Sequence, residues 1–337
     1  MKKVTVQSGQ SLASNSFHYH RRQNYSLVLA TIKEHSPLSR PEIARITGLS
    51  HPTVCTIVEE LRQKNLVRFR KVNNSGVGRP PLEVEFQKDI GFIVGIDVGL
   101  ESYGLVADLN GKPIRQQRFS LSKNKFSLQQ LDDFVKQLLD ISGKQRLLGI
   151  AVAISGLVTS QGEYFCLQNN QKFPVKKELE ERFGVPTIVE NDANIMMLAE
   201  VRAGVARGAE NAIYILKTTS GIGFGLLING SIYRGRQGYA GENMNLIPEV
   251  VTSRDSSPSQ EFITGLRRLV YLFDPEVIIL GGSLVGLGKS FLEKVRKSLP
   301  DRKFPGAGVR VEASRLGRES IVLEVVHQGI ARLFGLE

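Results

Sequence analysis

Apolar residues recur at helical spacing in two stretches near the amino terminus. Residues 24–35 place Leu27, Val28 and Ile32 on one side of a helix, and Pro37 follows them. Side chains three and four residues apart share one helix face, so each stretch predicts a helix with a buried stripe. The second stripe is formed by Val54, Ile57, Val58 and Leu61.

Between these stripes, capping residues predict a further short helix. In Ser39-Arg40-Pro41-Glu42 a hydroxyl precedes a carboxylate by three residues, with proline in the first turn, which is a capping box. Gly48 ends this helix and Ser50 is a good N-cap for the next. Two short helices joined by Thr47-Gly48-Leu49 have the spacing of a helix-turn-helix.

A hairpin is predicted after the third helix. Residues 66–72 and 82–86 have the composition of strands, and residues 73–81 between them are rich in glycine, proline and asparagine. A hairpin in this place is the wing of a winged helix-turn-helix. We therefore predict that residues 1–88 form a DNA-binding domain.

Candidate DNA contacts follow from how such a domain docks. Residues near the start of the third helix reach base edges when that helix lies in the major groove. Basic residues of the hairpin can approach phosphates, and the arginine of Gly78-Arg79-Pro80 suits a narrow minor groove. Taken one at a time, an ordinary surface residue or a simple turn explains each of them as well. The candidates are Arg40, Ser50, His51, Thr53, Thr56, Arg68, Arg70 and Arg79.

The charge is concentrated at the same end of the chain. The net charge is +11, of which residues 1–88 hold +8 and residues 89–337 hold +3. A basic module at one end is expected of a polyanion-binding protein, although a solvated face has similar composition. There is no apolar stretch of about 18 residues, no signal peptide, and Cys55 and Cys166 are the only cysteines. We expect a cytoplasmic protein without membrane contact.

From residue 90 onwards strands and helices alternate, which predicts an α/β domain in two lobes over residues 89–337. The predicted strands are 91–99, 103–109, 113–120, 147–154, 185–189, 211–216, 224–228 and 277–280. The predicted helices are 127–141, 192–205, 260–273, 290–299 and 319–334.

Glycine- or acid-bearing clusters stand at the ends of these elements, and each alone is explained by turn chemistry. They are Asp97-Val98-Gly99, Glu190-Asn191-Asp192, the run 220–225, and Gly281-Gly282-Ser283. In this order, together with Glu190–Asn194, the run 220–242 and the segment 274–283, they resemble the ROK family of sugar kinases and sugar-responsive repressors. The amino-terminal motifs resemble its repressor branch. The resemblance implies a two-lobed, actin-like ATPase fold.

Two departures from the kinases of that family bear on function. The first phosphate loop reads Asp97-Val98-Gly99-Leu100-Glu101, where the kinases have Asp-x-Gly-Gly-Thr. Leu100 hinders close backbone approach and Glu101 repels an anion, so we expect no phosphoryl transfer, no catalytic residue and no nucleotide cofactor. After Glu242 the family's cysteine cluster is missing, which predicts no metal site.

The sugar site is better preserved. Asn191 and Asp192 offer an amide and a carboxylate for neighbouring hydroxyls, although the same pair also fits an N-cap. The resemblance adds further positions. The candidate effector residues are Gly156, Asn170, Asn191, Asp192, Glu242 and Asn245.

The sequence thus predicts a transcriptional repressor that binds a double-stranded DNA operator as a homodimer or higher oligomer and senses a monosaccharide or derivative. An ATP-dependent sugar kinase of the same family is the alternative. A regulator controlled by a partner protein is a third interpretation.

Overall fold

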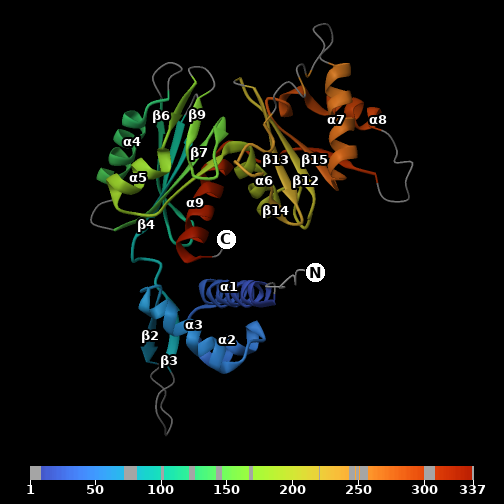
Figure 1. Cartoon of the computed structure of the whole chain (residues 1–337). Coiled ribbons are helices and arrows are strands. Elements are labelled where there is room, and N and C mark those ends of the chain that lie inside the picture. Colours follow the sequence, from blue (N-terminus) through green and yellow to red (C-terminus); the bar gives the residue numbers. More distant parts are fainter. Residues whose placement is uncertain are drawn as a thin grey trace, which may run out of the picture.

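The chain folds into an amino-terminal helical unit with a hairpin and two larger lobes, each built on a five-stranded sheet (Figure 1). The structure is a computed structural model. It describes residues 9–71, 82–99, 102–120, 126–141, 146–166, 170–219, 221–242, 247, 250, 257–299 and 308–335.

The amino-terminal unit is the predicted winged helix-turn-helix. The capping box is present: the Ser39 amide donates to Glu42 Oε2 (2.8 Å) and the Glu42 amide to Ser39 Oγ (3.4 Å). Gly48 ends the helix in the left-handed conformation, with φ of 69°. The three strands pair antiparallel in the order β1-β3-β2. The elements are α1 (Gly9–His35), β1 (Leu38–Ser39), α2 (Arg40–Thr47), α3 (His51–Gln63), β2 (Val67–Lys71) and β3 (Leu82–Phe86).

The first helix is longer than predicted, because it begins at Gly9 and not near residue 24. Residues 9–23 are mostly polar and give no apolar stripe, so the periodicity missed them. Within the predicted part Val28 and Ile32 are buried, whereas Leu27 is exposed.

The first lobe combines an antiparallel and a parallel half. Its strand order is β11-β7-β4-β5-β6; β4, β5 and β6 run antiparallel, while β7 and β11 are parallel to β4. The strands are β4 (Phe92–Val98), β5 (Ser102–Asp108), β6 (Pro113–Phe119), β7 (Leu147–Ile154) and β11 (Thr187–Asn191). Beside them lie α4 (Leu128–Ile141), α5 (Val175–Phe183) and a small sheet of β8 (Leu157–Val158), β9 (Tyr164–Cys166) and β10 (Gln171–Phe173).

The second lobe repeats this connectivity. Its order is β14-β13-β12-β15-β16, with β12, β13 and β14 antiparallel and β15 and β16 parallel to β12. The repetition confirms the predicted two-lobed α/β fold. The elements are β12 (Ala212–Lys217), β13 (Ile222–Ile228), β14 (Ser231–Ile232), α7 (Gln260–Phe273), β15 (Val277–Gly282), η1 (Val285–Leu287), α8 (Gly288–Ser298) and β16 (Arg310–Ala313).

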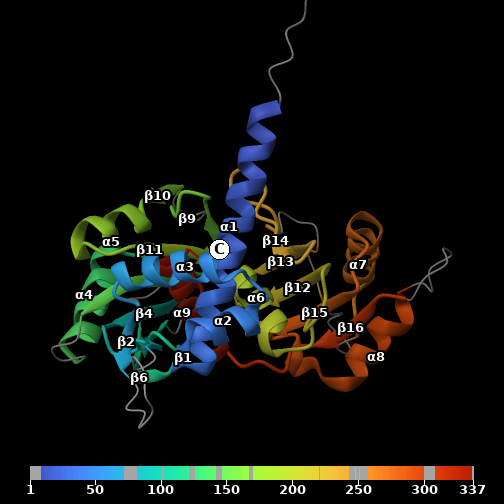
Figure 2. The same cartoon turned by 90° about the horizontal axis from the view of Figure 1, so that it is seen from below.

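Two helices, α6 (Asp192–Ala203) and α9 (Glu319–Phe334), lie between the lobes in both views (Figures 1 and 2). Helix α6 packs on β12, β13 and α9, and α9 packs on the sheet of the first lobe. A Cβ atom at Gly95 would collide with Val326 of α9, so this helix lies directly on the sheet. The start of α6 follows directly on β11 of the first lobe, while the helix packs on β12 and β13 of the second.

Predicted elements of the lobes agree with the structure at most positions. Helices 260–273 and 319–334 have the predicted bounds. The strand predicted at 185–189 is instead Thr187–Asn191, and α5 was missed because its only buried side chains are Val175 and Leu179. Among the described residues, no helix is long and apolar enough to cross a membrane.

Candidate functional site

The turn from β11 into α6 is held by Asn191. Its Oδ1 accepts hydrogen bonds from the amides of Ala193 (2.8 Å) and Asn194 (3.2 Å), so Asn191 is the N-cap of α6. Its Nδ2 donates to the carbonyl oxygen of Gly156, 2.9 Å away. One side chain therefore caps the helix and ties it to the loop after β7.

Asp192 is buried beside this cap. It is 7% exposed, and its Oδ1 accepts a hydrogen bond from the Ala193 amide at 2.9 Å. Burial raises the pKa of Asp192 to about 7, and the carboxyl groups of Asp97 and Glu242 add to the rise, while a hydrogen bond to Ser155 opposes it. The side chain can therefore exchange a proton near neutral pH.

Glu242 brings a second carboxyl group from the other lobe. Its backbone pairs with Gly223 at the start of β13. Burial raises the pKa of Glu242 to about 7, and its charge contributes to the shift at Asp192. The structure thus brings together four of the predicted effector residues, Gly156, Asn191, Asp192 and Glu242.

Tyr164 of β9 joins this group and was not predicted. A Cβ atom at Gly156, where φ is 127°, would lie 3.1 Å from the Tyr164 ring. Burial raises the pKa of Tyr164 to about 12, and the charge of Asp192 contributes. The ring lies 4.8 Å from Phe126 and 6.1 Å from Phe173, measured between centroids. No spacing pattern in the sequence connects these aromatic residues to Asp192.

The remaining two predicted effector residues are Asn170 and Asn245. Asn170 is exposed in the turn before β10, with φ of 56°. Among the described residues no hydrogen bond links it to Asn191 or Asp192. Asn245 and most of the segment that replaces the cysteine cluster lie outside the described residues, so the absence of zinc stays a prediction.

A salt bridge joins the lobes beneath the turn. Arg234 Nε donates to Glu190 Oε2 at 2.6 Å. The other oxygen of Glu190 accepts from the Asn191 amide (3.0 Å) and from Asn194 Nδ2 (2.9 Å). Arg234 follows β14, so this contact fixes the turn against the second lobe.

The first phosphate loop is occupied by an arginine of the protein. Asp97, near the end of β4, is 2% exposed, and Arg318 Nε donates to its Oδ2 at 2.9 Å. A Cβ atom at Gly99 would collide with Arg318 Nη2. Burial raises the pKa of Asp97, and the guanidinium group of Arg318 opposes this rise.

The turn as described does not fit a metal-bound nucleotide phosphate. The carboxylate of Asp97 is already paired with Arg318, and the guanidinium group covers Gly99. Leu100 and Glu101 lie outside the described residues. Arg318 follows Asp97 by 221 residues, so no local pattern in the sequence predicts this pair.

The start of α3 presents the predicted base-reading side chains. His51 and Thr56 are exposed, and Ser50 caps the helix by accepting from the Thr53 amide (3.3 Å). The Thr53 hydroxyl lies 2.8 Å from Ser50 Oγ. The predicted stripe is buried on the other side of the helix. The outward face of α3 is therefore polar and accessible.

Three of the predicted DNA-contacting arginines already have partners within the amino-terminal unit. Arg68 donates to Glu85 (2.8 Å) and Arg70 to Glu83 (3.0 Å). The Arg40 guanidinium lies over the Phe69 ring, 4.8 Å from its centroid. Arg68 and Arg70 each give one N–H to glutamate and are more than half exposed, so their remaining N–H groups can still reach a phosphate. Arg79 lies outside the described residues.

Comparisons with known proteins cover both parts of the chain. The ROK family model matches residues 93–247, and the MarR family model matches residues 22–76. The xylose repressor of Bacillus subtilis (strain 168) is 31% identical, over 90% of this chain and 96% of that protein. The DNA-binding transcriptional dual regulator NagC of Escherichia coli (strain K12) is 26% identical, over 66% of this chain and 56% of that protein.

Solved structures show the same fold. A crystal structure of a ROK family transcriptional regulator, described as a homolog of the E. coli MLC protein, has a TM-score of 0.73 at 18% identity and covers 94% of this chain and 98% of its own. A ROK family glucokinase from Streptomyces griseus, in complex with glucose and AMPPNP, has a TM-score of 0.56 at 20% identity, over 71% of this chain and 99% of its own. By the extent of these matches, the chain belongs to the ROK family.

Proposed function

We propose that this protein is a DNA-binding transcriptional repressor that takes a monosaccharide or a derivative as its effector. The observation that carries the proposal is a winged helix-turn-helix joined to a ROK fold that keeps the Asn191–Asp192 turn but fills its phosphate loop with Arg318. Relatives named xylose repressor and NagC support it. We assign residues 1–88 to DNA binding and residues 89–337 to effector binding.

On DNA, α3 lies in the major groove with His51, Thr53 and Thr56 at base edges. Arg68 and Arg70 reach phosphates with the N–H groups that their glutamate partners leave free, which makes binding salt-dependent. Two such units in a homodimer match an inverted repeat, whose half-sites are about 34–36 Å apart or a multiple of that. A repressor acts where the chromosome is, so we place the protein in the cytoplasm.

In the effector domain, Asn191, Asp192 and Glu242 hold sugar hydroxyls, and Tyr164 provides an apolar face. The carboxyl groups come from both lobes, so a bound sugar favours one arrangement of the lobes. A change in that arrangement alters DNA affinity by moving the two winged units relative to each other.

A thermal-shift screen of sugars and sugar phosphates tests the effector assignment. A ligand at about 100 times its dissociation constant adds about 2.7 kcal/mol of apparent stability. We expect one sugar to shift the wild type and Asp133→Ala but not Asp192→Ala. Asp133 is a matched control because its carboxylate lies exposed on α4. An equal thermal shift in Asp192→Ala contradicts the assignment. If no sugar shifts the unfolding temperature of the wild type, control by a partner protein is favoured instead.

Sugar phosphorylation is the second candidate function. Asp192 has a pKa of about 7, which suits a general base for a sugar hydroxyl. The Arg318–Asp97 pair argues against it, because the Arg318 guanidinium group lies against Gly99 and hinders the close approach of phosphates to the loop backbone. We expect no product from ATP–Mg²⁺ with any hexose. Phosphorylated sugar that disappears in Asp192→Asn would establish the kinase instead.

A further inference from the structure

Helix α6 begins at the candidate effector site and ends near the DNA-binding unit. Asp192 is its first residue, and its last turn carries Arg202. A helix of 12 residues is about 18 Å long. Its two ends therefore lie in different surroundings.

At its far end, α6 is tied to α9. Arg202 Nε donates to Glu324 Oε2 at 2.8 Å, and Arg202 Nη2 donates to Glu324 Oε1 at 3.2 Å. The Glu324 side chain is 3% exposed, whereas that of Arg202 is 50% exposed. Gln328 also donates to Glu324 Oε1, at 2.7 Å. A two-point contact to a buried carboxylate is strongly oriented, so a shift of Arg202 disturbs it.

Lys33 of α1 lies at the same junction. Its Nζ is 5.6 Å from the centroid of the Phe86 ring and 5.7 Å from that of Phe334. Burial lowers the pKa of Lys33, Asp108 opposes this, and the positive charge of Arg202 lowers it further. Arg202 and Lys33 therefore lie close enough for their charges to interact.

His327 completes this group of charges. It belongs to α9, and its ring packs beneath Gly111 in the turn between β5 and β6. Burial lowers the pKa of His327, and the charges of Arg202 and Lys33 lower it further, while Glu324 raises it. The titratable and charged groups of the junction are Lys33, Asp108, Arg202, Glu324 and His327.

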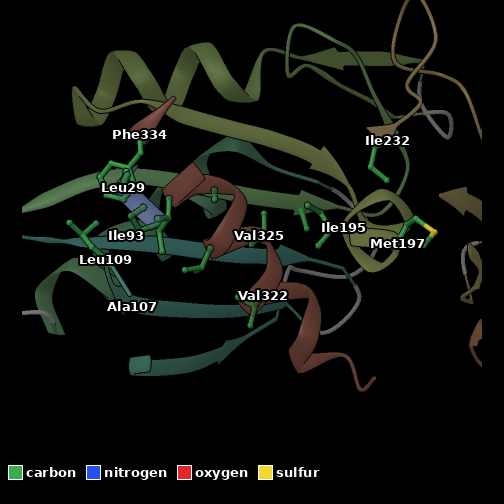
Figure 3. Packing of buried hydrophobic residues seen from close by; sticks show 14 of the residues in the cluster. Leu29, Ile93, Ala107, Leu109, Ile195, Met197, Ile232, Val322, Val325 and Phe334 are labelled. Carbon is green, nitrogen blue, oxygen red and sulfur yellow. The ribbon is translucent and has the colours of Figure 1, made fainter. Parts of the chain in front are cut away.

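Apolar packing at the junction is continuous. One buried cluster includes residues of α1, the first lobe, α6 and α9. Leu29 lies beside Phe334, while Ile195 and Met197 belong to α6 (Figure 3). Phe86 meets Phe334 edge-on, with 6.2 Å between ring centroids. A dense interior of this kind transmits displacement instead of absorbing it.

We propose that Arg202 is a positioning residue that couples the effector site at the start of α6 to helix α1 of the DNA-binding unit. A change at Asp192 shifts α6 and, with it, the Arg202–Glu324 ion pair. The shift changes the packing around Lys33 of α1 and the charges near it. The proposal rests on the proposed function, since it says how the sugar site and the DNA-binding unit communicate.

Hydrogen–deuterium exchange of the full chain tests the coupling without sugar or DNA. The readout is amide exchange in residues 24–35 of α1, because local opening sets exchange rates. Asp192→Asn removes the charge of a buried carboxyl at the start of α6. We expect it to change α1 exchange by about fivefold or more, and we expect that change to disappear when Arg202→Met is also present.

Arg182→Met is the matched control. Arg182 Nε lies 2.6 Å from Asp132 Oδ1, with side-chain exposures of 48% and 6%, which resembles the Arg202–Glu324 pair. The effect of Asp192→Asn on α1 must persist in this variant. Arg202→Lys keeps the charge but not the two-point contact, so it should restore the coupling in part.

Urea unfolding identifies any variant that fails to fold. If Arg202→Met does, the double variant Arg202→Met/Glu324→Gln replaces it and avoids a buried unpaired charge. The proposal is overturned if Asp192→Asn leaves α1 exchange unchanged in the otherwise wild-type chain, or changes it equally with and without Arg202. A failure of the repressor function would appear instead as absent DNA selectivity, which this experiment does not read.

Discussion

Asp97 and Asp192 occupy equivalent places at two strands of one sheet but have different surroundings. Asp97 lies near the end of β4 and Asp192 directly follows β11. Both are buried, and burial raises the pKa of both. Asp97 has the guanidinium group of Arg318 against it, whereas the charged groups that shift the pKa of Asp192 are carboxyls.

The difference separates a structural carboxyl from one that can serve a ligand. A buried carboxylate that already faces a cation gains less from a sugar hydroxyl than one without such a partner. Ionising a buried carboxyl next to like charges costs free energy. A hydroxyl that donates a hydrogen bond to the carboxylate lowers that cost. We interpret the Asp97 turn as a former phosphate loop whose ion pair with Arg318 now stabilises the fold. We interpret the Asp192 turn as the effector-binding site.

The largest expected effect concerns the pH dependence of stability. The pKa of Asp192 is raised from 3.8 to about 7, so the folded state binds more protons than the unfolded state between these values. The contribution of this group to the free energy of unfolding therefore falls as pH rises from about 4 to about 7. In the wild type this group should lower the free energy of unfolding by about 4 kcal/mol over that window. We expect this decrease to be absent in Asp192→Asn, as measured by urea unfolding at several pH values.

Glu242 titrates over the same window, because its pKa is also raised to about 7. Part of the slope should therefore survive in Asp192→Asn and disappear only in the double variant with Glu242→Gln. If Asp192→Asn has the same dependence of stability on pH as the wild type, the pKa of Asp192 is not raised in the folded protein.

Removal of the cation at the other turn should have the next largest effect. Arg318→Met leaves Asp97 buried without a partner, which costs about 3–5 kcal/mol for fully buried pairs. The side chain of Arg318 is 46% exposed, so we expect about 2 kcal/mol at pH 7 in urea unfolding. Asp97→Asn in the same chain should recover most of the loss. If Arg318→Met is as stable as the wild type, the interpretation of the Arg318–Asp97 pair as a stabilising contact is wrong.

The smallest expected effect is at Tyr164. Tyr164→Phe keeps the ring against Gly156 and removes only the hydroxyl, so its stability should stay within about 1 kcal/mol of the wild type. Tyr164→Ala removes the ring as well. For a sugar found in the screen, calorimetry should show a larger loss of affinity in the alanine variant. Equal losses would assign the contact to the hydroxyl and not to the aromatic face.

The sequence predicted local structure well and contacts between distant residues poorly. Ser39–Glu42 and Ser50 gave the helix starts because capping is decided within three or four residues. Asn191 and Asp192 were also predicted, because the pair fits an N-cap and because the family resemblance marks it as part of the sugar site. Arg318 was not, because its partner lies 221 residues earlier and only the folded chain brings the two together. The pair of Arg202 with Glu324 is another such contact.

Selection of bound duplexes from a random-sequence DNA library tests the central claim most directly. The full chain is used at about 150 mM salt, where non-specific phosphate contacts are weakened. The account predicts enrichment of an inverted repeat with half-sites about one or more helical turns apart, and loss of the enriched sequence's advantage in the double variant His51→Ala/Thr56→Ala. A selected pool indistinguishable from the starting library would contradict the account.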